Sequence, residues 1–224
     1  MHSGLAAVWN DYLDLRYRLF RSRAHSGVIA RILLALVMAV LVGLAAQVRI
    51  PLPWSPVPIT GQTFAVLLAG VLLGRRWGGV SMAFYAGLGV MGVPWFTGWG
   101  SGMSHLAGPT GGYILGFIFA ALFIGYMTDR YVRSRSFLSM LGIMLVANFL
   151  FIYGMGLIQL GFWMNMVKGS AVTFSGLLYM GLIPFLAGDM TKAVAAAAIA
   201  RVITPKKAYS DEADNGKWSS WRLP

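Results

Sequence analysis

The amino-acid sequence predicts an all-α integral membrane protein with six transmembrane helices, and three observations support this fold class. Of the 224 residues, 58% are hydrophobic and only 11% are charged, and the mean hydropathy is +0.69. Soluble domains carry about 25% charged residues, so this chain lacks the charge to cover a water-facing surface. Long uncharged runs recur along the chain, and the basic residues gather in alternate connections between them.

The net charge of +11 is explained by membrane orientation, without any nucleic-acid partner. All but three of the 18 basic residues fall into four groups: Arg16, Arg18, Arg21, Arg23 and Arg31; Arg75 and Arg76; Arg130, Arg133 and Arg135; and Arg201, Lys206, Lys207, Lys217 and Arg222. Basic connections concentrate on the cytoplasmic side of multi-pass proteins. The grouping therefore predicts that both termini lie in the cytoplasm.

The first uncharged run, residues 32–48, has the length of a short membrane-spanning helix. The next segment, 49–63, cannot continue a helix and favours extended backbone because it contains four prolines, Pro51, Pro53, Pro56 and Pro58. A second helix is expected from about Thr60 to Leu73.

Between Arg76 and Asp129 the sequence contains no Asp, Glu, Lys or Arg. This stretch is too long for one crossing, so we expect two helices, near 77–92 and 111–127. The connection between them, 93–111, is rich in Gly, Trp and Pro, which predicts an irregular outer loop.

A fifth helix fits residues 137–158, and 161–183 is ambiguous between a loop, a short surface helix and a re-entrant segment. Pro184 suits the first turn of a helix. A sixth helix over 184–203 then has about the length needed to cross a bilayer.

These elements divide the chain into a basic N-terminal extension (1–28), a six-helix membrane domain (29–203) and a cytoplasmic tail (204–224). The extension does not resemble a signal peptide, because its charges are spread out and no small-residue cleavage site follows a short apolar core. We expect an amphipathic helix on the anionic cytoplasmic leaflet, with a solvated extension as the alternative.

Asp189 and Lys192 are expected in the first two turns of the sixth helix, on one face and on the outer side. Ionisable residues inside a membrane usually face a cavity or a partner. One interpretation is a mutually satisfied pair near the interface. The other is a ligand-binding pair, in which Asp189 accepts ligand N–H groups and Lys192 donates to a ligand oxygen.

The two irregular outer segments carry aromatic residues that are candidates for the wall of a small-molecule pocket: Trp54, Trp95, Phe96, Trp99 and Tyr113. For each tryptophan alone, anchoring at the membrane interface is the competing interpretation. Several aromatics within one uncharged, glycine-rich loop favour a ligand lid.

Enzyme and metal motifs are weak in this sequence. It has no HExxH, no carboxylate-rich metal cluster, no cysteine and no GxxxxGK[ST] phosphate-binding loop. We therefore expect no metal and no cofactor, and a transporter of this kind must use a motor or gradient that it does not itself supply. On the first helix, Ala35 and Ala39 form a small-residue ladder that suits either internal packing or contact with another protein.

Four segments resemble the BioY family, the biotin-binding S component of energy-coupling factor (ECF) transporters. They read "IPLPWSPVPITGQTFAVLLAGVLLG" (50–74), "GLGVMGVPWFTG" (87–98), "GPTGGYILGF" (108–117) and "GDMTKA" (188–193). The resemblance extends from about residue 30 to residue 203. It implies a multi-pass protein of the bacterial cytoplasmic membrane, not an enzyme, that takes up biotin from the outside.

The resemblance also implies partners and site residues. Family members pair with a T component and two ATPase subunits, and an AxxxA motif that Ala35 and Ala39 match contacts the T component. Some members have an Asn in the loop after the third helix, where Thr97 is the nearest polar residue here. The expected substrate-binding residues are Asp189, Lys192, Thr97, Phe96, Trp99, Gln62, Tyr113 and Tyr153. Self-association of the chain is left open. The alternative functions are an S component for another vitamin and a membrane enzyme using Asp189 and Lys192.

Overall fold

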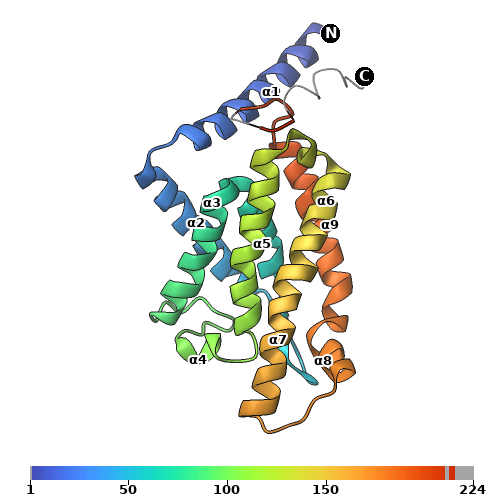
Figure 1. Ribbon diagram of the computed structural model, residues 1–224. Helices are drawn as coiled ribbons and strands as arrows, with labels where there is room; N and C mark the ends of the chain where they lie inside the picture. Colours follow the sequence, from blue (N-terminus) through green and yellow to red (C-terminus); the bar gives the residue numbers. More distant parts are fainter. Residues whose placement is uncertain (1, 210–211, 215–224) are drawn as a thin grey trace.

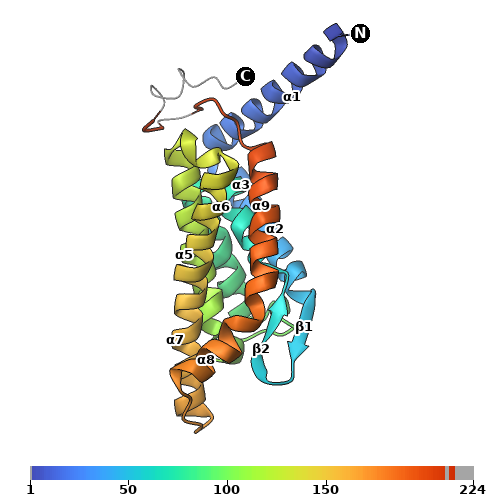
Figure 2. The ribbon, with the colours of Figure 1, turned by 90° about the vertical axis from the view of Figure 1, so that its right-hand side faces the viewer.

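A computed structural model describes residues 2–209 and 212–214 of the chain. The helices form an elongated bundle, with the first helix and the end of the last helix at the same end (Figure 1). We call this the proximal end. The opposite end, which we call the distal end, carries the short helix α4 (Met103–Leu106; Figure 1) and two β-strands (Figure 2). That both termini lie on one side of a membrane stays a prediction.

Two helices and a hairpin begin the fold. Helix α1 (His2–His25) lies across the proximal end, and α2 (Val28–Gln47) runs from there to the distal end. The strands β1 (Arg49–Leu52) and β2 (Ser55–Thr60) then pair antiparallel. The extended backbone predicted from the prolines is confirmed, although the pairing of the two strands was not predicted.

Helix α3 (Gln62–Val90) is interrupted at Gly74, where φ is +80°, a conformation that favours glycine. The two halves fold back on each other, since a Cβ added at Gly78 would lie 3.0 Å from Cα of Gly70. The two helices expected over 60–73 and 77–92 are therefore the two halves of α3, joined by a tight turn.

The second half of the chain supplies longer helical runs than predicted. In order these are α4 (Met103–Leu106), α5 (Gly111–Arg130), a 3₁₀ turn (Val132–Arg135), α6 (Phe137–Val146), a π-helical segment (Ala147–Tyr153), α7 (Gly154–Phe162), a second π-helical segment (Trp163–Val167), α8 (Phe174–Gly181), a 3₁₀ turn (Ile183–Phe185) and α9 (Leu186–Ile203). The segment 161–183 thus continues one helix, turns, and forms the short helix α8. Pro184 lies in the 3₁₀ turn directly before α9, as its position predicted.

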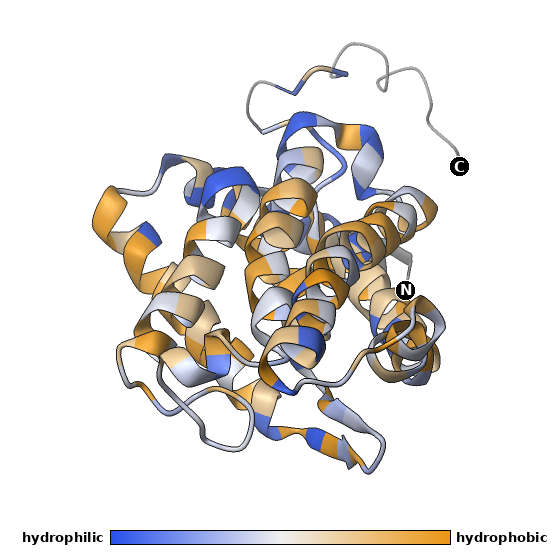
Figure 3. Cartoon of the chain, turned by 60° about the horizontal axis from the view of Figure 1, so that its bottom comes forward, coloured by the Kyte–Doolittle hydropathy of each residue, from blue (hydrophilic) through white to orange (hydrophobic). Residues whose placement is uncertain are grey.

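Five helical runs in the described chain are long and apolar enough to cross a membrane: Val28–Gln47, Gln62–Val90, Gly111–Arg130, Phe137–Val167 and Phe174–Ile203. Hydrophobic residues dominate the bundle helices in Figure 3. On α2, large apolar side chains such as Leu33, Val37 and Leu44 are exposed. Such surfaces suit lipid rather than water, so the chain is a mostly helical, multi-pass membrane protein.

Ala35 and Ala39 are fully buried, at 0% exposure each. Helix α2 packs closely on α3 there, and the Ser81 hydroxyl donates to the Ala35 carbonyl oxygen at 2.9 Å. The structure gives both alanines a packing role within the chain, and their direct contact with a partner stays a prediction.

The N-terminal extension and the start of the C-terminal tail are tied to the proximal end of the bundle. Arg23 of α1 donates to the backbone oxygens of Val71 and Leu72, at 2.8 and 3.0 Å, and pairs with Asp129. In the tail, Glu212 forms a buried ion pair with Arg135 at 2.7 Å. Residues 215–224 of the predicted tail lie outside the described residues.

Candidate functional site

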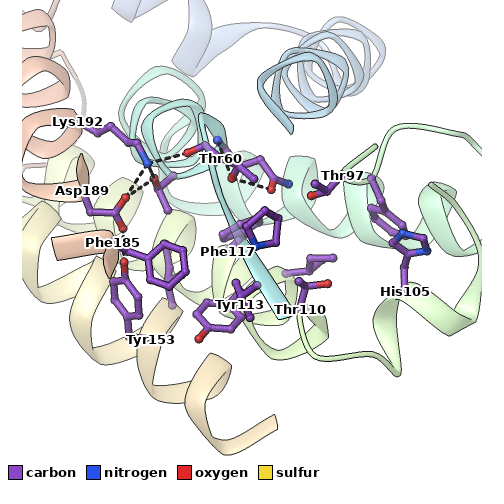
Figure 4. Close-up of a pocket in the computed structure, with 17 residues that line it drawn as sticks. Thr60, Thr97, His105, Thr110, Tyr113, Phe117, Tyr153, Phe185, Asp189 and Lys192 are labelled. Carbon is purple, nitrogen blue, oxygen red and sulfur yellow. Dashed lines mark hydrogen bonds and ion pairs between the residues drawn. The ribbon is translucent and has the colours of Figure 1, made fainter. Parts of the chain in front are cut away.

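A cavity lies towards the distal end and offers about 600 Å³ of unoccupied space, its open mouth included. It is bounded by β2, the start of α3, the loop before α4, α5, the first π-helical segment and α9 (Figure 4). Small-molecule sites usually have about this size, with mostly apolar walls and a few placed polar groups. The cavity matches that description: the charged pair Asp189 and Lys192 lies at one end, and the polar side chains of Thr97, Thr110 and His105 lie at the other (Figure 4).

Asp189 is almost completely buried, and its carboxylate accepts four hydrogen bonds. Oδ1 accepts from Lys192 Nζ at 2.7 Å and from the Thr63 hydroxyl at 3.1 Å. Oδ2 accepts from the Tyr153 hydroxyl at 2.6 Å and from Asn148 Nδ2 at 3.1 Å. These four donors fill the acceptor sites of an ionised carboxylate, which keeps the buried charge compensated.

Lys192 lies one turn further along α9 and also has all of its donors occupied. Its ammonium group donates to the Thr60 carbonyl oxygen at 2.6 Å and to Thr63 Oγ1 at 3.2 Å, besides its ion pair with Asp189. Its side chain is 20% exposed, against 4% for that of Asp189. The pair is thus mutually satisfied, as one interpretation expected, and it also lines the cavity, with Lys192 the more accessible member. Ligand binding by the pair stays a prediction.

The π-helical segment brings Asn148 and Tyr153 to the same carboxylate. Residues five apart on an α-helix lie about 140° apart around the axis, since a turn takes 3.6 residues. The i→i+5 hydrogen bonding of a π-helix instead widens the turn and brings residues five apart nearer to one face, and such segments often occur at functional sites. The irregularity of this helix therefore builds one side of the site.

Gln62 is held at the other side of the polar cluster. Its Nε2 donates to the hydroxyl of Tyr85 at 2.7 Å, and its Oε1 accepts from the Thr60 hydroxyl at 3.0 Å. Since the Thr60 carbonyl also accepts from Lys192, this residue links Gln62 to the ion pair. The segment that joins β2 to α3 thereby positions polar groups at the cavity.

Phe96 forms part of the apolar wall and is fixed by its neighbours. Its ring packs edge-on against Tyr85, with centroids 5.3 Å apart, and stacks on His105 at 5.7 Å. The ring fits only because residue 89 is glycine: a Cβ there would lie 2.2 Å from the ring carbon Cζ of Phe96. Tyr113 also lines the cavity, and its hydroxyl donates to the Gly181 carbonyl oxygen at 2.8 Å.

Most of the candidate residues meet at this cavity. Its lining includes seven of the eight candidates: Asp189, Lys192, Thr97, Phe96, Gln62, Tyr113 and Tyr153. Trp99 is the exception; its side chain is 63% exposed, and its backbone N–H donates to Gln47 Oε1. Trp54 and Trp95 do not line the cavity either, since Trp54 is half exposed and the Trp95 indole donates to the Tyr85 carbonyl oxygen.

Sequence reasoning missed three residues that complete the polar cluster. Thr60 and Thr63 lie in the quoted "PVPITGQT" segment, but nothing in that pattern shows that they face the last helix. Asn148 gave a usable signal, because it is the one amide side chain in the apolar run 137–158. A lone polar side chain within a transmembrane run usually bonds to another helix, as Asn148 does here.

A model of the BioY family matches residues 18–209 of the chain. A probable biotin transporter BioY from Methanothermobacter thermautotrophicus is 48% identical over 70% of this chain and 100% of its own length. The biotin transporter BioY from Thermotoga maritima is 35% identical over 73% of this chain and 89% of its own.

The fold is similar to a crystal structure, at 2.1 Å, of the S-component for biotin from an ECF-type ABC transporter. The TM-score is 0.67 with 27% identity, and the match covers 77% of this chain and 89% of that one. The range that the family model matches, residues 18–209, includes every residue that lines the distal cavity. It also includes Arg23 and Tyr209, which contact each other at the proximal end. Family model, relatives and fold agree, and the chain belongs to the BioY family.

Proposed function

We propose that this chain binds biotin in the distal cavity and serves as the S component of an ECF transporter, taking up biotin across the cytoplasmic membrane. One observation carries the proposal at the level of residues: the cavity combines apolar and aromatic side chains with the charged Asp189–Lys192 cluster at one end. The relatives named above are described as biotin transporters, and the site suits that ligand.

Biotin combines a neutral ureido head with a thiophane ring and an aliphatic chain. The ureido oxygen is an acceptor suited to Lys192, where it would replace Thr63 Oγ1, the most distant of the three present acceptors at 3.2 Å. The ureido N–H groups are donors suited to Asp189. Aromatic side chains such as Phe96 and Tyr113 suit the apolar part of the ligand. Binding that pairs every ureido group is favoured, because a buried polar group left unpaired is costly.

The filled hydrogen-bond sites indicate where the ligand enters the cluster. Oδ2 of Asp189 is held by two side chains from the same helix, whereas Oδ1 is shared between Lys192 and Thr63. The Thr63 hydroxyl is neutral and donates at the longer distance, 3.1 Å. Its exchange for a ureido N–H replaces one hydrogen bond by another, so we infer that the ligand contacts Asp189 at Oδ1.

The enzyme alternative is not favoured, because the BioY family is a family of transporter components. We further propose that the chain crosses the membrane six times, with the two halves of α3 as separate crossings and both termini in the cytoplasm. A T component and ATPase subunits would supply the motor that this sequence lacks. Contact of the Ala35 and Ala39 region with the T component belongs to the same proposal.

A ligand panel tests the function and separates biotin from other vitamins. The full-length chain, purified in detergent, is titrated with biotin, desthiobiotin and thiamine in an equilibrium binding assay. We expect stoichiometric binding of biotin, weaker binding of desthiobiotin because its thiophane ring is missing, and no binding of thiamine. Tighter binding of thiamine than of biotin would assign the chain to another vitamin.

A further inference from the structure

A second cavity lies at the proximal end, beside the junction of α1 and α2, and is strongly basic. It offers about 860 Å³ of space, its open mouth included. Its charged lining consists of five arginines and one carboxylate: Arg23, Arg31, Arg75, Arg76, Arg130 and Asp129. It is far from the distal cavity in the fold, and the two share no lining residue.

The single carboxylate is already used within the chain. Asp129 pairs with Arg23, accepts from the Tyr209 hydroxyl at 2.9 Å and accepts from the backbone N–H of Arg75 at 2.7 Å. Burial raises the pKa of Tyr209 above its ordinary value of 10.0, so its phenol keeps the proton that it donates. Asp129 therefore makes no ion pair with Arg31, Arg75 or Arg76 in the described chain.

Three of those arginines present donors that an anion can use. Nε of Arg31 is buried and has no hydrogen-bond partner among the described residues, while its Nη2 donates to the Ala24 carbonyl oxygen at 2.9 Å. Arg75 and Arg76 are exposed, and within the described chain their guanidinium groups make no hydrogen bond or ion pair. A buried unpaired N–H on a cation is costly, which an anionic ligand would relieve.

An apolar groove continues from the basic cavity along the outside of the bundle. Arg23 and Leu73 line both spaces. The other aliphatic and phenylalanine side chains of the groove come from α1, α2, α3 and α9: Leu15, Leu19, Phe20, Leu34, Val37, Met38, Leu72 and Ile203. Leu34 and Val37 belong to the exposed apolar face of α2, so the groove opens where lipid chains would lie.

We propose that this composite site binds an anionic phospholipid of the cytoplasmic leaflet, with its phosphate among Arg31, Arg75 and Arg76 and one acyl chain in the groove. Basic pockets between transmembrane helices on the cytoplasmic side suit anionic headgroups. Guanidinium groups bind phosphate with paired, charge-assisted hydrogen bonds. A free phosphate ion would use the arginines alone, whereas a phospholipid uses both the arginines and the groove.

Native mass spectrometry of the full-length chain in detergent tests the site, using phosphatidylglycerol, phosphatidylcholine and inorganic phosphate as probes. The test variant is Arg75→Gln/Arg76→Gln, because these side chains make no contact that the fold requires. The matched control is Arg133→Gln, an exposed arginine at the same end that lines neither space. This assay needs no biotin, so its result is independent of the function proposed above.

We expect the parent chain to retain phosphatidylglycerol about tenfold better than phosphatidylcholine, and the double variant to lose about that preference. Arg133→Gln should behave as the parent, and excess inorganic phosphate should not displace the lipid. Equal retention of the two lipids by the parent would overturn the proposal, as would displacement by phosphate. Parent-like selectivity in the double variant would overturn it as well.

Discussion

Asn148 and Tyr153 stand five positions apart in the chain, yet both donate to the same oxygen of Asp189, at 3.1 and 2.6 Å. Two donors on one oxygen fix the direction of the carboxylate before any ligand arrives. Preorganisation of this kind lowers the entropic cost of ordering side chains when the ligand binds. The site is therefore expected to depend on these donors as well as on Asp189 itself.

Tyr153→Phe removes one hydroxyl and keeps the ring. A hydrogen bond to a charged group contributes about 1.5–3 kcal/mol, so we expect a lower free energy of unfolding and weaker biotin binding. Tyr113→Phe is the matched control, because its hydroxyl bonds to the Gly181 carbonyl oxygen and not to Asp189. Thermal unfolding and biotin titration of both variants provide the check. Equal losses of biotin affinity would argue against a special role for Tyr153.

Asn148→Leu replaces the amide by an apolar side chain of similar size. Its Oδ1 has no partner among the described residues, so the substitution removes one hydrogen bond and also one unpaired acceptor. We expect it to destabilise the chain less than Tyr153→Phe does, because the two effects oppose each other. Unfolding midpoints measured side by side decide the order, and a larger loss for Asn148→Leu would contradict it.

Gly89→Ala should weaken biotin binding by moving the ring of Phe96 from the cavity wall. The added Cβ would lie 2.2 Å from that ring, whereas a Cβ at Gly87 would have no neighbour within 4 Å. Gly87→Ala, two positions away on α3, is therefore the control and should be neutral or stabilising by about 0.4–1 kcal/mol. Biotin affinity that is the same in both variants would exclude Phe96 from the binding wall.

The proposed topology can be tested by cysteine labelling, because the chain contains no cysteine of its own. Single cysteines at Arg76 and Arg133 should react only from the cytoplasmic side. Single cysteines at Trp99 and Lys168 should react from outside. An externally labelled Arg133→Cys would overturn the arrangement with both termini in the cytoplasm.

The sequence predicted the fold where single residues determine the backbone. The prolines between 51 and 58 and Pro184 gave correct element boundaries because proline restricts its own φ and the residue before it. The run 137–167 was predicted too short, since apolar composition alone does not mark where a helix ends. The pairing of β1 with β2 depends on tertiary contacts that the four prolines do not encode.

The site was predictable in part. Asp189 and Lys192 were identified because charges in an apolar helix need compensation, and their spacing of three placed them on one face. Trp99 is exposed and does not line the cavity; its contact with a ligand stays a prediction, because an aromatic residue in a loop serves the membrane interface equally well. Asn148 could not be paired with Tyr153, because a regular α-helix would point them in different directions.

The most direct test of the account is equilibrium binding of labelled biotin to the purified full-length chain and to Asp189→Asn. The substitution keeps the shape but turns one acceptor into a donor that faces the donors of the cluster. We predict stoichiometric binding by the parent and at least about tenfold weaker binding by Asp189→Asn, roughly 1.4 kcal/mol. Lys192→Met should also weaken binding, and Lys168→Met, at an exposed lysine, should not. If Asp189→Asn binds biotin as tightly as the parent, the ion pair is structural and the site assignment is wrong.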